Sequence, residues 1–149
     1  MCVIYTNYLA SIVGTPFQYC IKNSNLDLFQ LGFGEVVAVE SDNTQTLEIN
    51  KYAIHFDSAI YLYWKNGMVD RFYSDSHAQV FNEALSCLIG KKVNRIKLSS
   101  KNDLWIEFED CKMVIVTRDD EDESWRFLLP RTNYPHLIAS SISLVLDDE

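Results

Sequence analysis

The residues best placed to do chemistry are His55 and Asp57, two positions apart in a segment of alternating apolar and polar residues. Residues two apart in a β-strand point to the same face, so the carboxylate could orient the imidazole as a general base. The same pattern is typical of a structural histidine that is hydrogen-bonded to a neighbour, and we predict this second role. His77, at the start of a predicted helix, and His136, in a predicted loop, have no chemical partners that the sequence identifies.

The densest charge in the chain is an uninterrupted acidic run, Asp119-Asp120-Glu121-Asp122-Glu123. Such a run is usually a solvated loop. It could also dock a basic partner through charge complementarity or bind a divalent cation. The EF-hand pattern requires a glycine that this run lacks, which counts against the cation. We expect Arg126, just beyond the run, to pair with the acids that precede it.

The sequence contains no pattern that predicts catalysis or a cofactor. It has no G-x-S-x-G nucleophile turn and neither of the glycine-rich phosphate-binding patterns. The cysteines are widely spaced without a C-x-x-C pair, so they do not predict a zinc site. They are Cys2, Cys20, Cys87 and Cys111. We therefore expect no enzyme activity, no cofactor and no metal, and we interpret the last three cysteines as small buried apolar residues.

The net charge of −8 is unevenly distributed, because residues 101–149 carry twelve acids and five bases, or −7, and the first hundred residues carry only −1. This balance argues against a nucleic-acid partner, which favours a basic face, and it is compatible with a basic protein partner. A basic stripe without interleaved aromatic residues is expected to pair with nearby carboxylates. The stripe consists of Lys91, Lys92, Arg95, Lys97 and Lys101.

No apolar stretch approaches the roughly 20 residues of a membrane-spanning helix, and the first residues do not resemble a signal peptide. Free cysteines fit a reducing compartment. We therefore expect a cytoplasmic protein without a membrane partner.

Two helices and a series of strands must position these residues. The first helix is predicted to begin near Thr6 or Asn7 and to end at Gly14, and the second to begin near Ser76 and to end at Gly90. Both show apolar residues at a spacing of 3.6 and a glycine at the end.

Strands are predicted where β-branched and aromatic residues gather or alternate with polar ones. The predicted strands are 17–21, 26–33, 36–40, 46–56, 59–64, 68–73, 93–98, 104–108, 112–117 and 124–129. Asn66-Gly67 predicts a tight hairpin. The segment 138–146 is ambiguous, with an alternation that indicates a strand. Short connections favour antiparallel pairing.

Two segments align without a gap, residues 9–33 and 85–109. Gly14 falls on Gly90, and Phe29 falls on Trp105. A constant offset over this length indicates a duplicated structural unit.

The prediction is therefore one domain, residues 1–149, with possible structural repeats 7–73 and 76–146. Each repeat would be a helix-plus-antiparallel-sheet unit. The predicted fold class is α+β, with about two helices packed on a β-sheet.

Three stretches resemble a known family. They are Tyr52-Ala53-Ile54-His55 with Trp64 in the following hairpin, the segment Asp103 to Asp110, and Glu123-Ser124-Trp125-Arg126-Phe127 with Pro130 and His136-Leu137-Ile138 beyond it. In this combination, residues from about 50 to 140 resemble small bacterial proteins that are found near polymorphic or contact-dependent growth inhibition toxin genes and are thought to be immunity proteins. The resemblance implies a protein that binds and neutralises the C-terminal domain of a cognate toxin, without catalytic residues of its own.

The acidic composition agrees with a basic nuclease as the toxin, because carboxylates can mimic substrate phosphates and occlude an active site. The predicted contact residues are Asp119, Asp120, Glu121, Asp122 and Glu123, with Glu109 and Asp110 beside them if the turns cluster. Two alternatives stay open. One is a homodimeric structural or regulatory protein that pairs through an exposed strand, and the other is an enzyme that uses His55 with Asp57.

Overall fold

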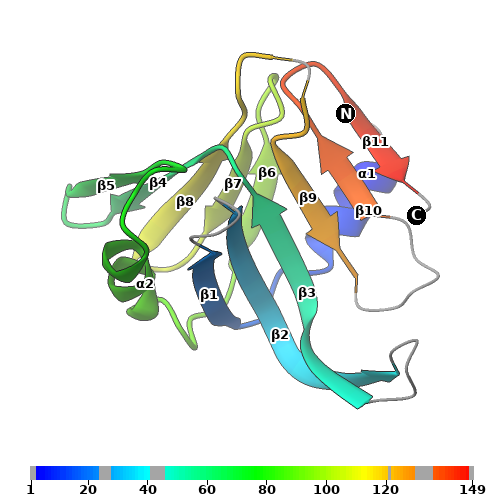
Figure 1. The fold of residues 1–149 in the computed structure, drawn as a ribbon, viewed down its shortest axis with the longest axis horizontal. Coiled ribbons are helices and arrows are strands. Elements are labelled where there is room, and N and C mark those ends of the chain that lie inside the picture. Colours follow the sequence, from blue (N-terminus) through cyan, green and yellow to red (C-terminus); the bar gives the residue numbers. More distant parts are fainter. Residues whose placement is uncertain (1–2, 24–27, 41–45, 121, 130–135, 148–149) are drawn as a thin grey trace.

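A computed structural model describes residues 3–23, 28–40, 46–120, 122–129 and 136–147. The fold is mostly β, with 51% strand and 11% helix, and it consists of two antiparallel sheets (Figure 1). The predicted α+β class, with two helices packed on a sheet, is therefore wrong. Each sheet buries its inner face mainly against the other sheet, and the short helices add only a few side chains to the core, such as Phe81 and Leu85.

The first sheet has six strands in the part of the chain that the structure describes. In spatial order they are β1 (Phe17–Asn23), β2 (Leu28–Glu40), β3 (Thr46–Phe56), β9 (Trp125–Leu128), β10 (His136–Ala139) and β11 (Leu144–Asp147). The second sheet has five. In spatial order they are β5 (Val69–Phe72), β4 (Ala59–Trp64), β8 (Cys111–Val116), β7 (Leu104–Glu107) and β6 (Arg95–Leu98).

The two helices are short, which is the physical reason that the α+β prediction fails. Helix α1 (Val3–Ala10) has 8 residues and helix α2 (Ala78–Ser86) has 9. Helix α1 contacts the edge strand β6, and α2 contacts the edge strand β1 (Figure 1). Both helices end earlier than predicted, because the chain makes further turns before Gly14 and Gly90, each of which has φ of +88°.

The core lies between the sheets and consists mainly of every second residue along each strand, which points inward, together with Leu9, Phe81 and Leu85 of the helices. Its fully buried members from the strands include Phe29, Leu31, Ile54, Phe56, Trp125 and Phe127 in the first sheet, and Ile60, Leu62, Leu104, Ile106, Met113 and Ile115 in the second. Trp125 is the largest of them, and its indole Nε1 donates a hydrogen bond to the backbone oxygen of Asn102 at 2.8 Å. A buried indole N–H needs such an acceptor.

The two halves of the chain contribute strands in the same pattern. Strands β1, β2 and β3 of the first half share a sheet with β9, β10 and β11 of the second, joined by the β3–β9 pair. Strands β6, β7 and β8 of the second half share a sheet with β4 and β5 of the first, joined by the β4–β8 pair. Each half therefore supplies its fourth and fifth strands to the sheet that the other half begins.

Two hydrogen bonds that join the halves involve equivalent residues, which lie 76 positions apart in the sequence. The amide of Gly14 donates to the oxygen of Val93 at 2.7 Å, and the amide of Gly90 donates to the oxygen of Phe17 at 2.7 Å. Descent of the two halves from a duplication, with the bounds 7–73 and 76–146, stays a prediction.

The offset between equivalent residues of the two halves changes from 76 to 75 further along the chain. Phe29 is fully buried, whereas Trp105, on which it was aligned, lies outward beside Glu107 and is only half-buried. The inward residue that corresponds to Phe29 is Leu104, one position earlier. A register shift in β1, between Phe17 and Tyr19, accounts for one extra residue in the first half.

Candidate functional site

The acidic run lies in the loop between β8 and β9, and an arginine inside the loop holds its conformation. The Arg118 guanidinium forms an ion pair with Asp57 beyond β3, and its Nη2 donates to the backbone oxygen of Glu123 at 2.7 Å. Its Nε lies 3.4 Å from Asp120 Oδ2. The Arg118 amide donates to the Ser124 hydroxyl oxygen at 2.9 Å. One guanidinium therefore joins both ends of the loop to β3.

A second arginine fixes the end of the loop. Arg126 donates from Nη2 to Glu123 Oε1 at 2.8 Å and from Nε to Oε2 at 3.2 Å, a two-point contact. This confirms the predicted pairing of Arg126 with the preceding acids. Its Nη1 lies 3.1 Å from His136 Nδ1 on β10.

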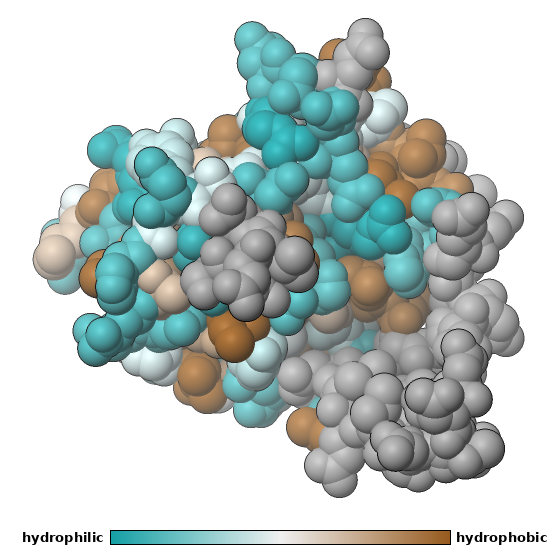
Figure 2. Space-filling model, viewed as in Figure 1, coloured by the Kyte–Doolittle hydropathy of each residue, from teal (hydrophilic) through white to brown (hydrophobic). Residues whose placement is uncertain are grey.

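The acids of the loop divide into two groups. Asp120 and Glu123 are paired with the two arginines. Asp119 and Asp122 are exposed, and the structure records no ion pair for either of them within the described segments. Figure 2 shows hydrophilic side chains gathered at the top of the molecule, where this loop projects in Figure 1. Glu121 lies outside the described residues.

The other two predicted contact residues lie away from the loop. Glu109 and Asp110 form the turn between β7 and β8, and the acidic loop follows the far end of β8. A strand of this length separates its two ends by roughly 20 Å. The two turns therefore do not cluster. Asp110 also forms an ion pair with Lys91 at 3.2 Å, and Arg95 lies 4.0 Å from Glu107, so these two bases of the stripe do pair with carboxylates as predicted.

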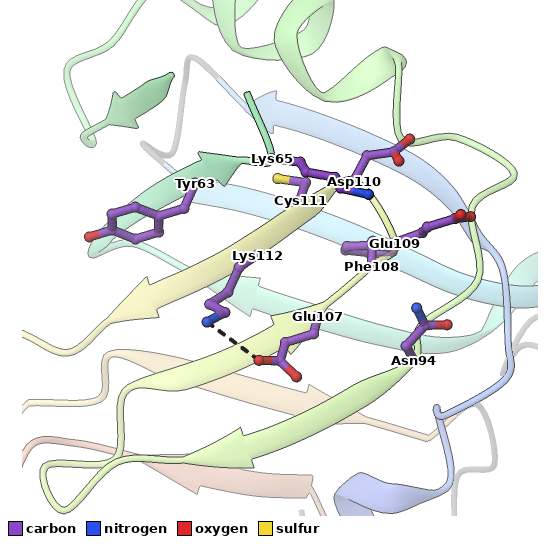
Figure 3. Close-up of a pocket in the computed structure, with 9 residues that line it drawn as sticks. All are labelled: Tyr63, Lys65, Asn94, Glu107, Phe108, Glu109, Asp110, Cys111 and Lys112. Carbon is purple, nitrogen blue, oxygen red and sulfur yellow. Dashed lines mark ion pairs between the residues drawn. The ribbon is translucent and has the colours of Figure 1, made fainter. Parts of the chain in front are cut away.

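Glu109 and Asp110 border an open depression of about 280 Å³ at the end of β8. Figure 3 shows the side chains around it, with Lys112 directed toward Glu107 and paired with it at 3.5 Å. Burial raises the pKa of the nearby Cys111 thiol to about 12, which disfavours the thiolate that a nucleophilic cysteine needs. Cys111 is buried as predicted, but Cys87 is exposed, so the prediction for that residue is wrong.

Asp57, the predicted partner of His55, forms an ion pair with Arg118. Among the described residues, the structure records no hydrogen bond between the Asp57 carboxylate and His55. Burial, and then the positive charges of His136 and Arg126, lower the pKa of His55. Burial, and then Arg126, lower the pKa of His136. The two imidazoles and Arg126 thus form one electrostatic cluster on the outer face of the first sheet.

Two further properties concern only the described residues. No group of three or more His, Cys, Asp or Glu side chains is placed there to hold a metal ion. Neither helix has both the length and the apolar character that crossing a membrane requires.

Comparison of this chain with protein-family models, with curated proteins and with solved structures finds no match. The function therefore has to be argued from the surface that the loop and the sheets present.

Proposed function

We propose that this chain is a cytoplasmic immunity protein, which binds the C-terminal domain of a cognate bacterial toxin and occludes its active site. The toxin domain in this proposal is a basic nuclease. The β8–β9 loop is the contact surface, with Asp119 and Asp122 as the residues that meet the basic site.

The observation that carries the proposal is the way the loop is held. Arg118 ties Asp57, Asp120 and the oxygen of Glu123 together, while Asp119 and Asp122 remain exposed. A loop that is ordered before binding loses less conformational entropy when it docks. Exposed carboxylates on such a loop also accelerate the encounter with a basic partner.

The two arginines reduce the negative charge of the loop but do not remove it. Residues 118–126 contain five acids and two arginines, a net charge of −3. The paired acids shape the loop, and the exposed acids remain available to a partner. Variants of Asp119 and Asp122 therefore test binding without breaking the arginine contacts.

The experiment begins with a pull-down from the native host, with the tagged protein as bait. Washes at about 0.1 M and then about 1 M salt shorten the screening length from roughly 10 Å to roughly 3 Å. We expect a stoichiometric basic nuclease domain that the second wash releases. The nuclease activity of the purified domain should then fall to zero at one equivalent of the protein.

The matched variants are Asp119→Asn/Asp122→Asn and Glu35→Gln/Asp75→Asn, which change the net charge equally at exposed positions. The first should weaken capture and the second should not. If both double variants lost the same amount of capture, the effect would come from overall charge, and the loop would not be the specific contact surface.

A homodimer is the second candidate function, and one observation favours it. Strand β5 is an edge strand, and the exposed fractions of Met68 and Val69 beside its hairpin are 61% and 41%. Exposed edges invite pairing with another chain. Sedimentation velocity over a wide concentration range decides the matter, because a constant monomer value contradicts the dimer.

A further inference from the structure

The outer face of the second sheet gathers aromatic and basic side chains that are scattered in the sequence. On β4, Ile60 and Leu62 point into the core, so Tyr61 and Tyr63 point outward. Strand pairing places one outward row across all five strands. The row consists of Arg71, Tyr61, Val114, Trp105 and Lys97. We call Tyr61, Tyr63, Trp105, Arg71, Lys97 and Lys112 the aromatic–basic face.

The rings of this face are packed against one another. The Tyr63 and Trp105 rings are nearly parallel, with an interplanar angle of 6° and centroids 6.5 Å apart. Tyr61 meets Tyr63 edge-on, with centroids 6.4 Å apart. Val114 points outward between Tyr61 and Trp105, yet the residue is only 3% exposed, although it lies outside the core cluster. The rings therefore form a supported platform on the sheet.

Cations surround these rings. Lys97 Nζ and Lys112 Nζ each lie 5.3 Å from the centroid of Trp105, and the Arg71 guanidinium carbon lies 5.6 Å from that of Tyr61. Figure 3 shows Lys112 beside Tyr63 and its ion pair with Glu107. With Arg95 and Glu107 included, the face has four bases and one acid, a net charge of +3 in a chain of −8.

The geometry points to a binding site for single-stranded nucleic acid on the aromatic–basic face. Unpaired bases stack on Tyr61, Tyr63 and Trp105, and phosphates lie along the cations from Arg71 to Lys97. Aromatic rings with flanking bases on an open sheet are the arrangement that binds single strands without sequence preference. Four strand spacings separate Arg71 from Lys97, roughly 19 Å. This distance equals about six stacked nucleotides at roughly 3.4 Å each.

The aromatic rings favour single-stranded nucleic acid over other anionic ligands. A duplex keeps its bases stacked inside and offers only phosphates to such a face. An acidic peptide would use the four bases but has no planar groups for Tyr63 and Trp105. The sequence-based argument against nucleic acid relied on the acidic net charge and on a basic stripe without interleaved aromatics. The sheet, however, places the aromatics of β4 and β7 between the bases of β5, β6 and β8, on a face whose own charge is positive. The inference does not depend on the proposed immunity function.

The test is a fluorescence anisotropy titration of labelled oligo-dT and oligo-rU of about 12 nucleotides, at about 50 mM salt. We expect micromolar binding that weakens with salt, and quenching of Trp105 fluorescence. Trp105→Ala and Tyr63→Ala should each lower the affinity about tenfold. Arg71→Gln/Lys97→Gln, which leaves the rings in place, should reduce the slope of log affinity against log salt by about 1.4.

The controls are Tyr19→Ala, an exposed tyrosine on the other sheet, and Lys92→Ala, an exposed base outside the face. Both should bind like the unmodified protein. No binding up to about 100 µM protein would overturn the inference. So would binding that survives Trp105→Ala, or a duplex or a polyglutamate peptide that binds as tightly as the single strand. Circular dichroism of each variant confirms that a loss of binding is not a loss of fold.

Discussion

At the scale of single residues, Arg118 and Arg126 decide how the acidic loop behaves. The pairing of Arg126 with Glu123 could be predicted from the sequence, because opposite charges lie three residues apart. The contact of Arg118 with Asp57 could not, because 61 residues separate them in the chain. A tryptophan in a strand is usually a core residue, and reading Trp105 in that way is wrong, because it points outward and is only half-buried. The signal that could have shown this is the alternation of the strand, since Leu104 and Ile106 share one face and Glu107 shares the other with Trp105.

Acid should destabilise the fold through the histidine cluster. The pKa values of His55 and His136 are lowered in the folded protein, so the unfolded chain binds protons more readily. Their stabilising contribution is present above the ordinary histidine pKa of about 6.5 and is lost as the pH falls through the folded values. Urea unfolding at several pH values measures this effect. His55→Gln/His136→Gln should flatten the dependence between neutral and mildly acidic pH, and an unchanged slope would contradict the electrostatic account of the cluster.

At the scale of elements, the strands were largely predictable and their partners were not. The strand Ala59–Trp64 has the bounds that alternation and the Asn66-Gly67 turn predicted. The ambiguous segment 138–146 separates into β10 and β11, joined by a turn in which the Ser140 amide donates to the Ser143 oxygen. Pairing β3 with β9 or β4 with β8 joins distant parts of the chain, which no local pattern encodes. The α+β prediction gave the helices a covering role for which they are too short, and these distant pairings assemble the second sheet, which mainly performs that role.

Asn102 joins three elements and offers a test at this scale. Its amide nitrogen donates to the oxygens of Ser140 and Ser143 at 3.0 and 3.1 Å, and its φ is +64°. Asn102→Ala should cost about 2–4 kcal/mol, from two lost hydrogen bonds and a left-handed backbone that alanine disfavours. Asn102→Gly should cost about 1 kcal/mol less, because glycine accepts positive φ. Chemical denaturation measures both, and equal losses would show that backbone conformation is not part of the cost.

At the scale of the whole molecule, the exchange of strands makes each half depend on the other. The inner residues of β1, β2 and β3 are covered by strands of the second sheet, and β9 and β10 complete their own sheet. A half of the chain alone would expose large apolar surfaces that the complete fold buries. The halves are also joined by two equivalent hydrogen bonds, one donated by the amide of Gly14 and one by the amide of Gly90.

Fragments 1–75 and 76–149 should therefore be largely unfolded when separate and should associate into a native-like complex when mixed. Far-ultraviolet circular dichroism and the emission of the buried Trp125 follow the recovery of structure. A cooperative thermal transition in either fragment alone would contradict this interdependence and would favour two autonomous repeats.

The most direct test of the proposed function is calorimetric titration of the captured toxin domain with the unmodified protein and with Asp119→Asn/Asp122→Asn, at low and high salt. The account predicts a one-to-one complex whose affinity falls at least tenfold in the variant at low salt, about 1.4 kcal/mol. The difference should shrink at high salt because screening weakens the contact. Equal affinities of the two proteins at low salt would contradict the loop as the binding surface.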